Sequence, residues 1–319
     1  MRVAALQLEA AVGNVEHNLE ECERLGERAG REGAELIVLP EFFTTGTANR
    51  PELRDVALPP DGAATELLLA LAARHDALVG GSYLCRDPDG HVRNAFVLAS
   101  PGGIAGRHDK DIPTMWENRL YVGGDDDGLI SVGKLTLGAA VCWELMRTQT
   151  AARLRGRADI VIGGSGWWSI PPWAPRPFLR ALERGNSERA VRAPARFAEY
   201  VGAPVVHAAH AGRLNCPMPG LPAHYHGRYE GAALVADAHG RVLACRSADE
   251  GSGISVADVA PGAVAPARAI PDRFWLQRRG LVPALFWAYQ NPLGRRQYRR
   301  EHGRKVVGVD RMLAADRVP

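Results

Sequence analysis

AELIVL at residues 34–39 and LTLGAAV at residues 135–141 are continuous apolar runs. Runs of this length and composition are typical of strands that are buried on both faces of a sheet. The first run leads into Glu41 and the second into Cys142. Each run therefore predicts a central strand that is followed at once by a side chain capable of chemistry.

Outward from these two runs, strands alternate with helices along the chain, which predicts an α/β architecture. A turn at Asp87-Pro88-Asp89-Gly90 joins two of the strands and makes them an antiparallel pair, so we expect a mixed sheet. The other strands are expected at 3–8, 77–84, 94–100, 158–162, 204–209, 231–237 and 242–245, and the helices at 14–30, 63–75, 147–155 and 187–200.

The sheet elements are expected to end near Val259, which predicts a domain over residues 1–260. A segment rich in Pro and Ala at 261–271 then leads into an extension that runs to residue 319. Residues 291–319 carry a net charge of about +5. We interpret this extension as an oligomer contact rather than as a nucleic-acid or membrane element.

Composition excludes several classes of protein. A net charge of +3 over 319 residues is too small to indicate a polyanionic partner, so we expect no nucleic acid. No run of about 20 apolar residues occurs, which excludes a membrane-spanning helix. The N-terminus lacks a secretion signal, and the five cysteines are scattered without a disulfide or metal pattern. We therefore expect a cytoplasmic protein with reduced thiols.

Glu41, Lys110 and Cys142 each have an ordinary interpretation when taken singly. A lone buried cysteine is usually an inert core thiol, and the two charged residues would usually be solvated. Together they fit one mechanism. A carboxylate can take the proton of a thiol, and a buried ammonium can stabilise first the thiolate and then an oxyanion.

Three segments resemble motifs of the nitrilase, or carbon–nitrogen hydrolase, superfamily. They are LPEFFTTG at 39–46, RHDKDIP at 107–113 and GAAVCWEL at 138–145. Their order and spacing also match, with 69 residues from Glu41 to Lys110 and 32 from Lys110 to Cys142. The resemblance extends more weakly over about residues 1–260.

This resemblance implies a four-layer αββα sandwich with mixed sheets, paired into a homodimer or larger assembly through its outer helices. It also implies an acyl-thioester intermediate without a metal or an organic cofactor. Cys142 would be the nucleophile, Glu41 the general base and Lys110 the oxyanion stabiliser. Glu117, seven residues after Lys110, would position these groups, and the backbone N–H of Trp143 would be a second oxyanion donor.

Substrate contacts are expected from Trp143 and Glu144, which follow the nucleophile, and from Trp167 and Trp168. The Trp pair, with Trp173 nearby, is interpreted either as a wall of the acyl pocket or as a loop packed on its own core or on another subunit. His207 and His210 lie three residues apart on an expected strand, so they point to opposite faces and do not suggest a metal site.

The expected function is hydrolysis of a small amide or N-carbamoyl compound. The trio Cys142-Trp143-Glu144 resembles true nitrilases, which act on nitriles through a thioimidate, although Leu145 replaces the Asn that often follows there. Gly163 and Gly164 likewise stand where Asn-Pro is frequent in the family. Acyl transfer to an amine and a non-catalytic binding protein on the same fold are the remaining alternatives.

Overall fold

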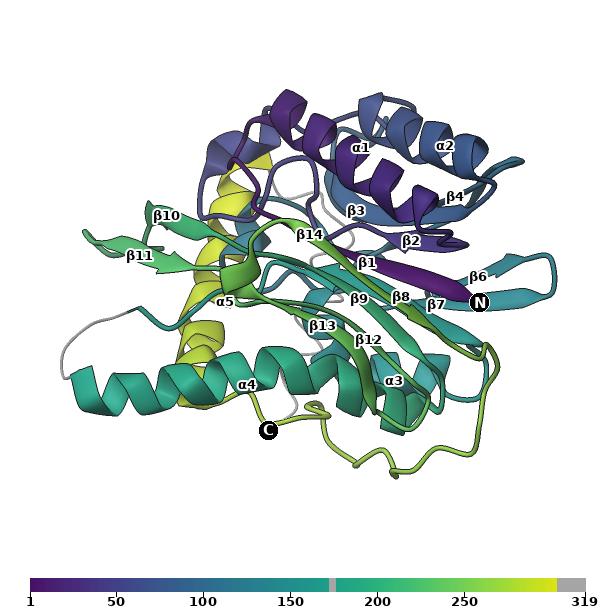
Figure 1. The fold of residues 1–319 in the computed structure, drawn as a ribbon. Coiled ribbons are helices and arrows are strands. Elements are labelled where there is room, and N and C mark those ends of the chain that lie inside the picture. Colours follow the sequence, from purple (N-terminus) through teal and green to yellow (C-terminus); the bar gives the residue numbers. More distant parts are fainter. Residues whose placement is uncertain (172–175, 303–319) are drawn as a thin grey trace.

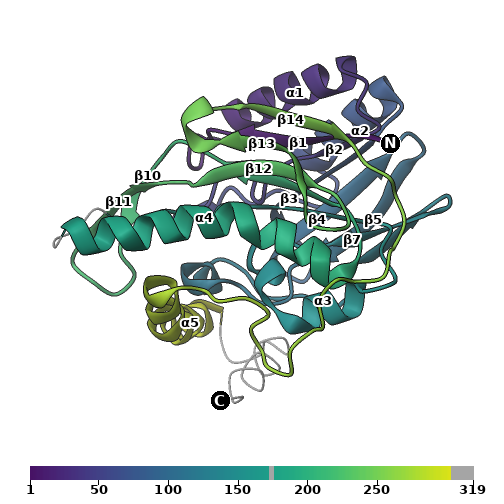
Figure 2. The same cartoon turned by 60° about the horizontal axis from the view of Figure 1, so that its bottom comes forward.

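The computed structural model describes residues 1–171 and 176–302, and it forms a sandwich of two sheet layers between two pairs of helices (Figures 1 and 2). The helices are α1 (Val15–Arg31), α2 (Ala63–His75), α3 (Thr148–Leu154), α4 (Arg176–Val201) and α5 (Leu281–His302). Short 3-10 segments are η1 (Pro51–Arg54), η2 (Met115–Arg119), η3 (Cys142–Met146) and η4 (Ala248–Glu250).

Twelve strands in the described residues form one mixed sheet that folds back on itself in the order β5-β4-β3-β2-β1-β9-β8-β7-β6, with β12 on β9, β13 on β12 and β14 on β1. The hairpin β10–β11 is separate. The strands are β1 (Arg2–Leu8), β2 (Leu36–Val38), β3 (Leu78–Arg86), β4 (Val92–Ser100), β5 (Gly103–Asp109), β6 (Leu129–Val132), β7 (Leu135–Ala139), β8 (Ile160–Ser165), β9 (Val205–His210), β10 (Arg213–Pro217), β11 (His224–Arg228), β12 (Gly231–Ala236), β13 (Val242–Ser247) and β14 (Gly253–Asp258).

Alternation along the strands produces the layers, because successive side chains point to opposite faces. Val3 and Ala5 of β1 belong to the core between the two sheet layers, whereas Ala4 and Leu6 pack under α1 and α2. On the other side, Val161 of β8 packs with α3 and α4. Both faces of these strands are therefore buried, which explains their unbroken apolar sequences.

The ends of three strands meet at one edge of the fold. The neighbours β1, β2, β3 and β9, β8, β7 run parallel, and β5 runs the same way because two antiparallel pairings connect it to β3. Glu41, Lys110 and Cys142 follow β2, β5 and β7 at their carboxyl ends. Reactive side chains gather at this edge in open α/β sheets.

The predicted four-layer α/β architecture with mixed sheets is confirmed. Helix α2 matches its predicted bounds, and Asn14 caps α1 by accepting a hydrogen bond from the backbone N–H of His17. The sequence interpretation missed β5, β6 and the β10–β11 hairpin, and it began α4 eleven residues too late. Trp173 and the basic residues after position 302 lie outside the described residues.

The extension after residue 260 folds back onto the same chain. Helix α5 packs against η2, the short helix that follows Lys110, and Figure 2 shows it beside α4. Whether this extension also contacts another subunit stays a prediction. Across the described residues, none of the helices combines the length and apolar character needed to cross a bilayer.

Candidate active site

The cysteine lies on a strained turn after β7, where it is the first residue of η3. Cys142 has a φ of +55°, in the left-handed region that L-residues rarely occupy. Phe42 and Met115 share this conformation, with φ of +51° and +55°. Both lie next to the site, since Phe42 directly follows Glu41 and Met115 begins the short helix that carries Glu117. Backbone strain of this kind concentrates where function requires a fixed side-chain direction.

Lys110 connects the two carboxylates. Its Nζ donates hydrogen bonds of 2.7 Å to Oε1 of Glu41 and 2.7 Å to Oε2 of Glu117. The sulfur of Cys142 and one oxygen from each carboxylate lie within 4.8 Å of one another. The side chains of Glu41 and Lys110 are fully buried. The structure thus brings together all four residues that the motifs pointed to.

Glu41 is held by three neighbours from different parts of the chain. The amide of Asn94 donates to its Oε1 at 2.9 Å, and the backbone N–H of Gly166 donates to its Oε2 at 3.1 Å. Nε2 of His210 lies 2.6 Å from its backbone carbonyl. At Gly164 an added Cβ would lie 2.8 Å from the backbone nitrogen of Glu41, so only glycine allows β8 this approach.

Glu117 is positioned in the same way. Its Oε2 accepts hydrogen bonds from the hydroxyl of Tyr121 at 2.6 Å and from the backbone N–H of Thr114 at 3.0 Å, besides the bond from Lys110. Each of these donors stabilises the ionised carboxylate. Glu117 therefore holds Lys110 through a second hydrogen bond, besides the one that Lys110 donates to Glu41.

Burial and charge set the protonation of the site. Burial and the neighbouring carboxylate of Glu41 raise the pKa of the Cys142 thiol well above its usual range. Burial also raises the pKa of Glu117, although Lys110 opposes the shift. Burial by itself would lower the pKa of the Lys110 ammonium, but the carboxylates of Glu117 and Glu41 outweigh burial and raise it. The cysteine is thus a thiol at rest, and its proton must be removed when it attacks.

The cluster of two carboxylates and a thiol also has the ligand atoms of a metal site. In this geometry Lys110 already supplies the cation, because its ammonium bonds both carboxylates at 2.7 Å. A metal ion would have to displace it. His207 and His210 do not converge, since His207 contacts the Ser165 hydroxyl while His210 contacts the carbonyl of Glu41.

A small cavity of about 20 Å³ opens onto the cysteine. Trp143, Trp167 and Trp168, which the sequence interpretation named as substrate contacts, all line it, and that role stays a prediction. The remaining lining residues are Thr114, Glu117, Cys142, Gly166, Asn186 and Pro283.

Glu144, the fourth predicted substrate contact, is not in this lining. Its fully buried carboxylate accepts hydrogen bonds from the backbone N–H of Val141 at 2.7 Å and of Asp111 at 3.1 Å. Nε2 of His108 and a guanidinium nitrogen of Arg153 each lie 3.0 Å from it. Burial opposes the negative charge, but His108 and Arg153 hold the pKa of Glu144 well below its usual range. The geometry favours a positioning role that connects the cysteine turn to the lysine loop.

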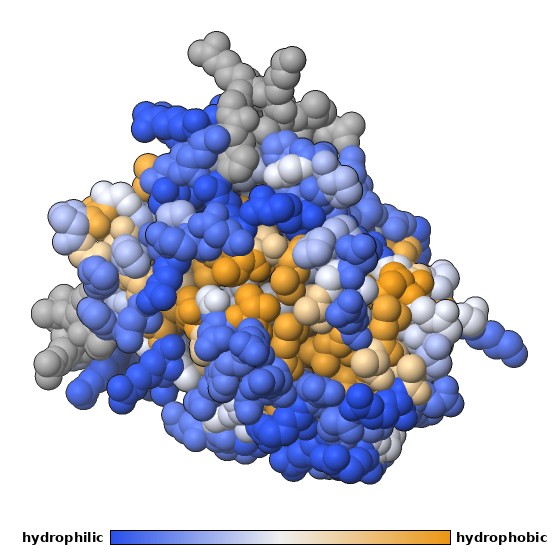
Figure 3. Space-filling model, turned by 90° about the horizontal axis from the view of Figure 1, so that it is seen from above, coloured by the Kyte–Doolittle hydropathy of each residue, from blue (hydrophilic) through white to orange (hydrophobic). Residues whose placement is uncertain are grey.

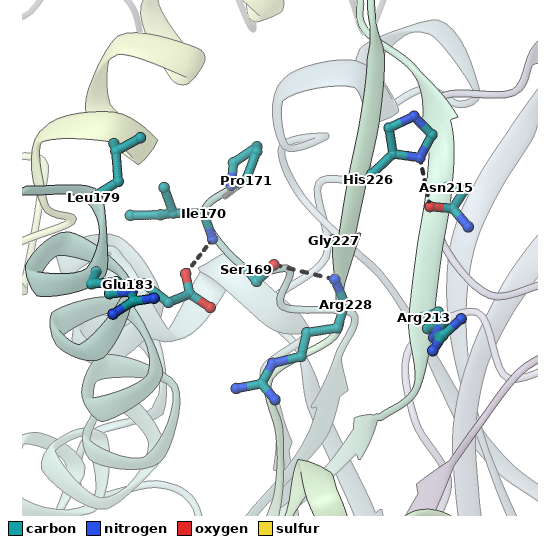
Figure 4. A pocket seen from close by; sticks show the side chains of 11 residues that line it. Ser169, Ile170, Pro171, Leu179, Glu183, Arg213, Asn215, His226, Gly227 and Arg228 are labelled. Carbon is teal, nitrogen blue, oxygen red and sulfur yellow. Dashed lines mark hydrogen bonds between the residues drawn. The ribbon is translucent and has the colours of Figure 1, made fainter. Parts of the chain in front are cut away.

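A larger cavity of about 810 Å³ lies between α4 and the β10–β11 hairpin (Figure 4). It touches the chain just beyond Trp168, where Glu183 accepts a hydrogen bond from the backbone N–H of Ile170. Burial and the carboxylate of Glu230 raise the pKa of Glu183 to about 7. None of Glu41, Lys110 and Cys142 lines this cavity, so the larger volume lies apart from the buried cluster.

Sequence reasoning missed the groups that hold these candidate residues in place. Asn94 stood inside an apolar strand, where a buried amide needs a partner, and that was its one signal. His108 lies within the lysine motif and Tyr121 follows it, and neither has a distinctive pattern of its own. The contribution of Pro283 was not foreseeable, because it comes from an extension without clear periodicity.

A thiol, a carboxylate and an ammonium are buried together at the carboxyl ends of the strands of a four-layer sandwich. The chain is therefore an α/β protein with a buried cysteine site. The chain belongs to the carbon-nitrogen hydrolase family, whose model matches residues 2–269. This result confirms the resemblance found from the three motifs.

Curated relatives within the family carry different activities in their names. A nitrilase of Pyrococcus abyssi is 28% identical over 190 residues, which are 57% of this chain and 71% of that protein. The omega-amidase YafV of Yersinia enterocolitica is 32% identical over 135 residues, which are 42% of this chain and 51% of that protein. The chain thus matches only part of each relative's length.

Solved structures show the same fold. An amidase from Nesterenkonia sp. AN1, with acrylamide added to its active-site cysteine, has a TM-score of 0.61 at 20% identity and covers 82% of this chain and 93% of its own. Saccharomyces cerevisiae Nit3 has a TM-score of 0.59 at 21% identity, over 81% of this chain and 89% of its own.

Proposed function

We propose that the chain hydrolyses a carbon–nitrogen bond outside peptides, in a small amide or an N-carbamoyl compound, through a thioester on Cys142. One observation carries the proposal. The sulfur of Cys142 lies within 4.8 Å of carboxylate oxygens of Glu41 and Glu117, and the ammonium of Lys110 bonds both carboxylates beside a cavity. The family provides the chemical class, with relatives named as nitrilase and omega-amidase.

In the first half of the reaction, Sγ of Cys142 attacks the carbonyl carbon while Glu41 takes the thiol proton. The carbonyl oxygen becomes an alkoxide, which the Lys110 ammonium and the backbone N–H of Trp143 stabilise. The carbon–nitrogen bond then breaks, and Glu41 returns the proton to the nitrogen. Ammonia or an amine leaves, and the acyl group stays on the sulfur.

In the second half, water gives a proton to Glu41 and attacks the thioester carbon. The carbon–sulfur bond breaks, the sulfur recovers the proton from Glu41, and the acid leaves. Glu117 takes no part in bond making, since its three hydrogen-bond donors occupy it with positioning Lys110.

The test is to trap the intermediate. The full chain is mixed with propionamide, quenched in acid and weighed by mass spectrometry, and a propionyl adduct is expected on the peptide that contains Cys142. Cys142→Ala should lack the adduct, whereas Cys245→Ala, which removes an exposed cysteine, should keep it. An adduct that persists in Cys142→Ala would refute the assignment.

Nitrile hydrolysis through a thioimidate is the second candidate. The trio Cys142-Trp143-Glu144 and the relative named as a nitrilase favour it. Ammonia release from matched amides, N-carbamoyl compounds and nitriles separates these substrates. Added hydroxylamine would yield a hydroxamate if the acyl group passes to amines, and a chain that releases no product from any of them would be a binding protein.

We also propose self-association through the outer helices. Seen from above, on the side that carries α1 and α2, apolar side chains form an area framed by hydrophilic ones (Figure 3). Helix α2 exposes Ala63, Ala70 and Ala73 and leaves Leu67 and Leu69 half-buried. Contiguous apolar areas of this kind often mark contacts between proteins. Sedimentation of wild type and of Ala70→Glu would test it, with a smaller species expected for the variant.

A further inference from the structure

The first half of α5, residues 281–289, covers the catalytic cavity; we refer to it as the lid segment. Pro283 lines the cavity together with Cys142. Trp287 stacks on Trp143, the residue after the nucleophile, with ring centroids 5.6 Å apart and planes inclined by 6°. Phe286 stacks on Trp168 at 5.5 Å. Both lid rings thus lie directly behind side chains that line the cavity.

The second half of α5 is attached by polar contacts instead. Oδ1 of Asn291 accepts hydrogen bonds from the backbone N–H of Met115 at 2.7 Å and from the amide of Asn118 at 3.0 Å. Glu301 pairs with Arg119 at 3.0 Å. Pro292 follows the first of these anchors inside the helix, where it removes one intrahelical hydrogen bond. The helix therefore consists of an apolar lid segment and an anchored half with a weak point between them.

The cavity under the lid segment is small and carries no counter-ion for a charged substrate. Its volume of about 20 Å³ has room for about one water molecule. Among the described residues that line it, the ionisable groups are Glu117 and Cys142, and three of the other seven residues are tryptophans. An amide can reach the thiol only if the lid segment moves, and its acyl group then lies against aromatic rings.

We propose that the lid segment is the wall that determines acyl specificity, and that it restricts Cys142 to amides with a small, uncharged, apolar acyl group. This proposal rests on the proposed amide hydrolysis and specifies its substrate class. Pro283, Phe286 and Trp287 set the depth of the acyl pocket. A dicarboxylic monoamide is a poor substrate, because its free carboxylate would be buried without a cationic partner.

The first experiment does not require turnover. Cys142 in the full chain is alkylated with iodoacetamide or with the bulkier iodoacetanilide, and peptide mass spectrometry gives both rates, with the exposed Cys245 as internal reference. Wild type should favour the small probe by about tenfold relative to Cys245. Trp287→Ala and Phe286→Ala should each reduce this preference by about fivefold. Leu285→Ala, whose side chain is on the same helix but 58% exposed, should keep it.

Circular dichroism confirms that each variant is folded, and Trp287→Leu replaces the alanine variant if that one unfolds, because it retains apolar volume without a stacking ring. A preference that stays within twofold of wild type in both lid variants would overturn the proposal. So would an equal loss of preference in Leu285→Ala, since the effect would then not be specific to the covering side chains.

The second experiment compares kcat/KM for propionamide, phenylacetamide and succinamate. Wild type should prefer propionamide over each of the others by about tenfold or more in kcat/KM. Trp287→Ala should raise kcat/KM for phenylacetamide relative to that for propionamide. If wild type hydrolyses none of the amides but the alkylation preference changes in the lid variants, the proposed function is refuted and the proposed role of the lid segment is supported. If amides are hydrolysed but the lid variants change neither the alkylation preference nor the ratio of kcat/KM values, the role of the lid segment is refuted and the proposed function is supported.

Discussion

Nζ of Lys110 lies 2.7 Å from Oε1 of Glu41, and both side chains are fully buried. Glu117 pairs with the same ammonium at 2.7 Å, so the two carboxylates exceed the single cation by one charge. A buried site with this excess favours protons on the remaining groups, in agreement with the raised pKa values of Glu117 and Cys142. Lys110 therefore matters for folding, besides its proposed role in catalysis.

Lys110→Met tests this dual role, because it keeps the apolar stem and removes the charge. Two buried carboxylates would then face each other without a cation, which should cost about 3–5 kcal/mol of unfolding free energy. Catalysis should fall by at least about 10³-fold through loss of the oxyanion partner. Urea unfolding and the rate of ammonia release measure the two effects, and Lys134→Met, at an exposed lysine, is the control.

A second substitution separates charge from packing. Glu117→Gln in the Lys110→Met background removes one of the two uncompensated charges, so part of the lost stability should return while activity stays low. A double variant no more stable than Lys110→Met would show that packing and not charge causes the loss.

Glu144→Gln tests the connection between the cysteine turn and the lysine loop. The amide can still accept hydrogen bonds, but it no longer offsets the charges of His108 and Arg153. We expect a loss of about 2–4 kcal/mol in stability and a lower kcat at little changed KM, because the carboxylate does not line the cavity. Asp127→Asn, which weakens an exposed pair with Arg157, should change stability by about 0.5 kcal/mol or less. A change in KM alone would instead support the substrate contact predicted from the sequence.

The sequence predicted those parts of the site that are marked by a pattern within a single segment of the chain. Glu41 and Cys142 end apolar runs that identify buried strands, so strand prediction alone placed them at a sheet edge. Lys110 and Glu117 required the motifs, because β5 (GIAGRHD) is too polar and too rich in glycine to be recognised by its pattern. The fold followed from alternation of strands and helices, a property of each segment in turn.

The features of the site that the sequence did not predict depend on contacts between segments that are far apart in the chain. Asn291 accepts a hydrogen bond from Met115 across 176 positions, and Trp287 stacks on Trp143. Neither contact has a signature in its own segment, and α5 carries apolar residues without a sustained helical period. Glu144 shows the same limit, since its position two residues after Cys142 suggested a substrate contact, while neither Glu144 nor its partners His108 and Asp111 line the cavity.

His108 predicts a dependence of stability on pH. Burial opposes its charge, as does Arg153 at 3.4 Å, but Glu144 and Asp126 outweigh both and raise the pKa of His108 to about 10. An unfolded histidine has a pKa of about 6.5. Because the folded value is higher, this stabilisation is complete below about pH 6.5 and is lost as the pH rises towards 10.

Urea unfolding of wild type and His108→Gln at pH 6, 8 and 10 measures the effect. The difference in unfolding free energy should be largest at pH 6 and should shrink at each higher pH. His239→Gln, at an exposed turn, controls for the loss of an imidazole. A difference that grew with pH would mean that His108 is neutral in the folded protein.

Gly164→Ala tests whether close approach of the backbone positions Glu41, the proposed general base. The added Cβ would lie 2.8 Å from the backbone nitrogen of Glu41 and 2.8 Å from Cα of Pro40, and backbone atoms cannot rotate out of the way. Glu41 must then shift relative to Lys110, and a displacement of about 1 Å at a catalytic group can cost about 10²-fold in rate. The expected result is a large drop in kcat with a modest change in melting temperature.

Gly102→Ala is the matched control, because its nearest neighbour would be Oγ of Ser100 at 3.8 Å and its backbone needs no left-handed conformation. Gly102→Ala should leave both kcat and the melting temperature unchanged. If Gly164→Ala kept full activity, the hydrogen bonds from Asn94 and Gly166 would suffice to orient the carboxylate wherever its backbone lies. Glu41 would then be positioned by its side-chain partners and not by the strand that precedes it.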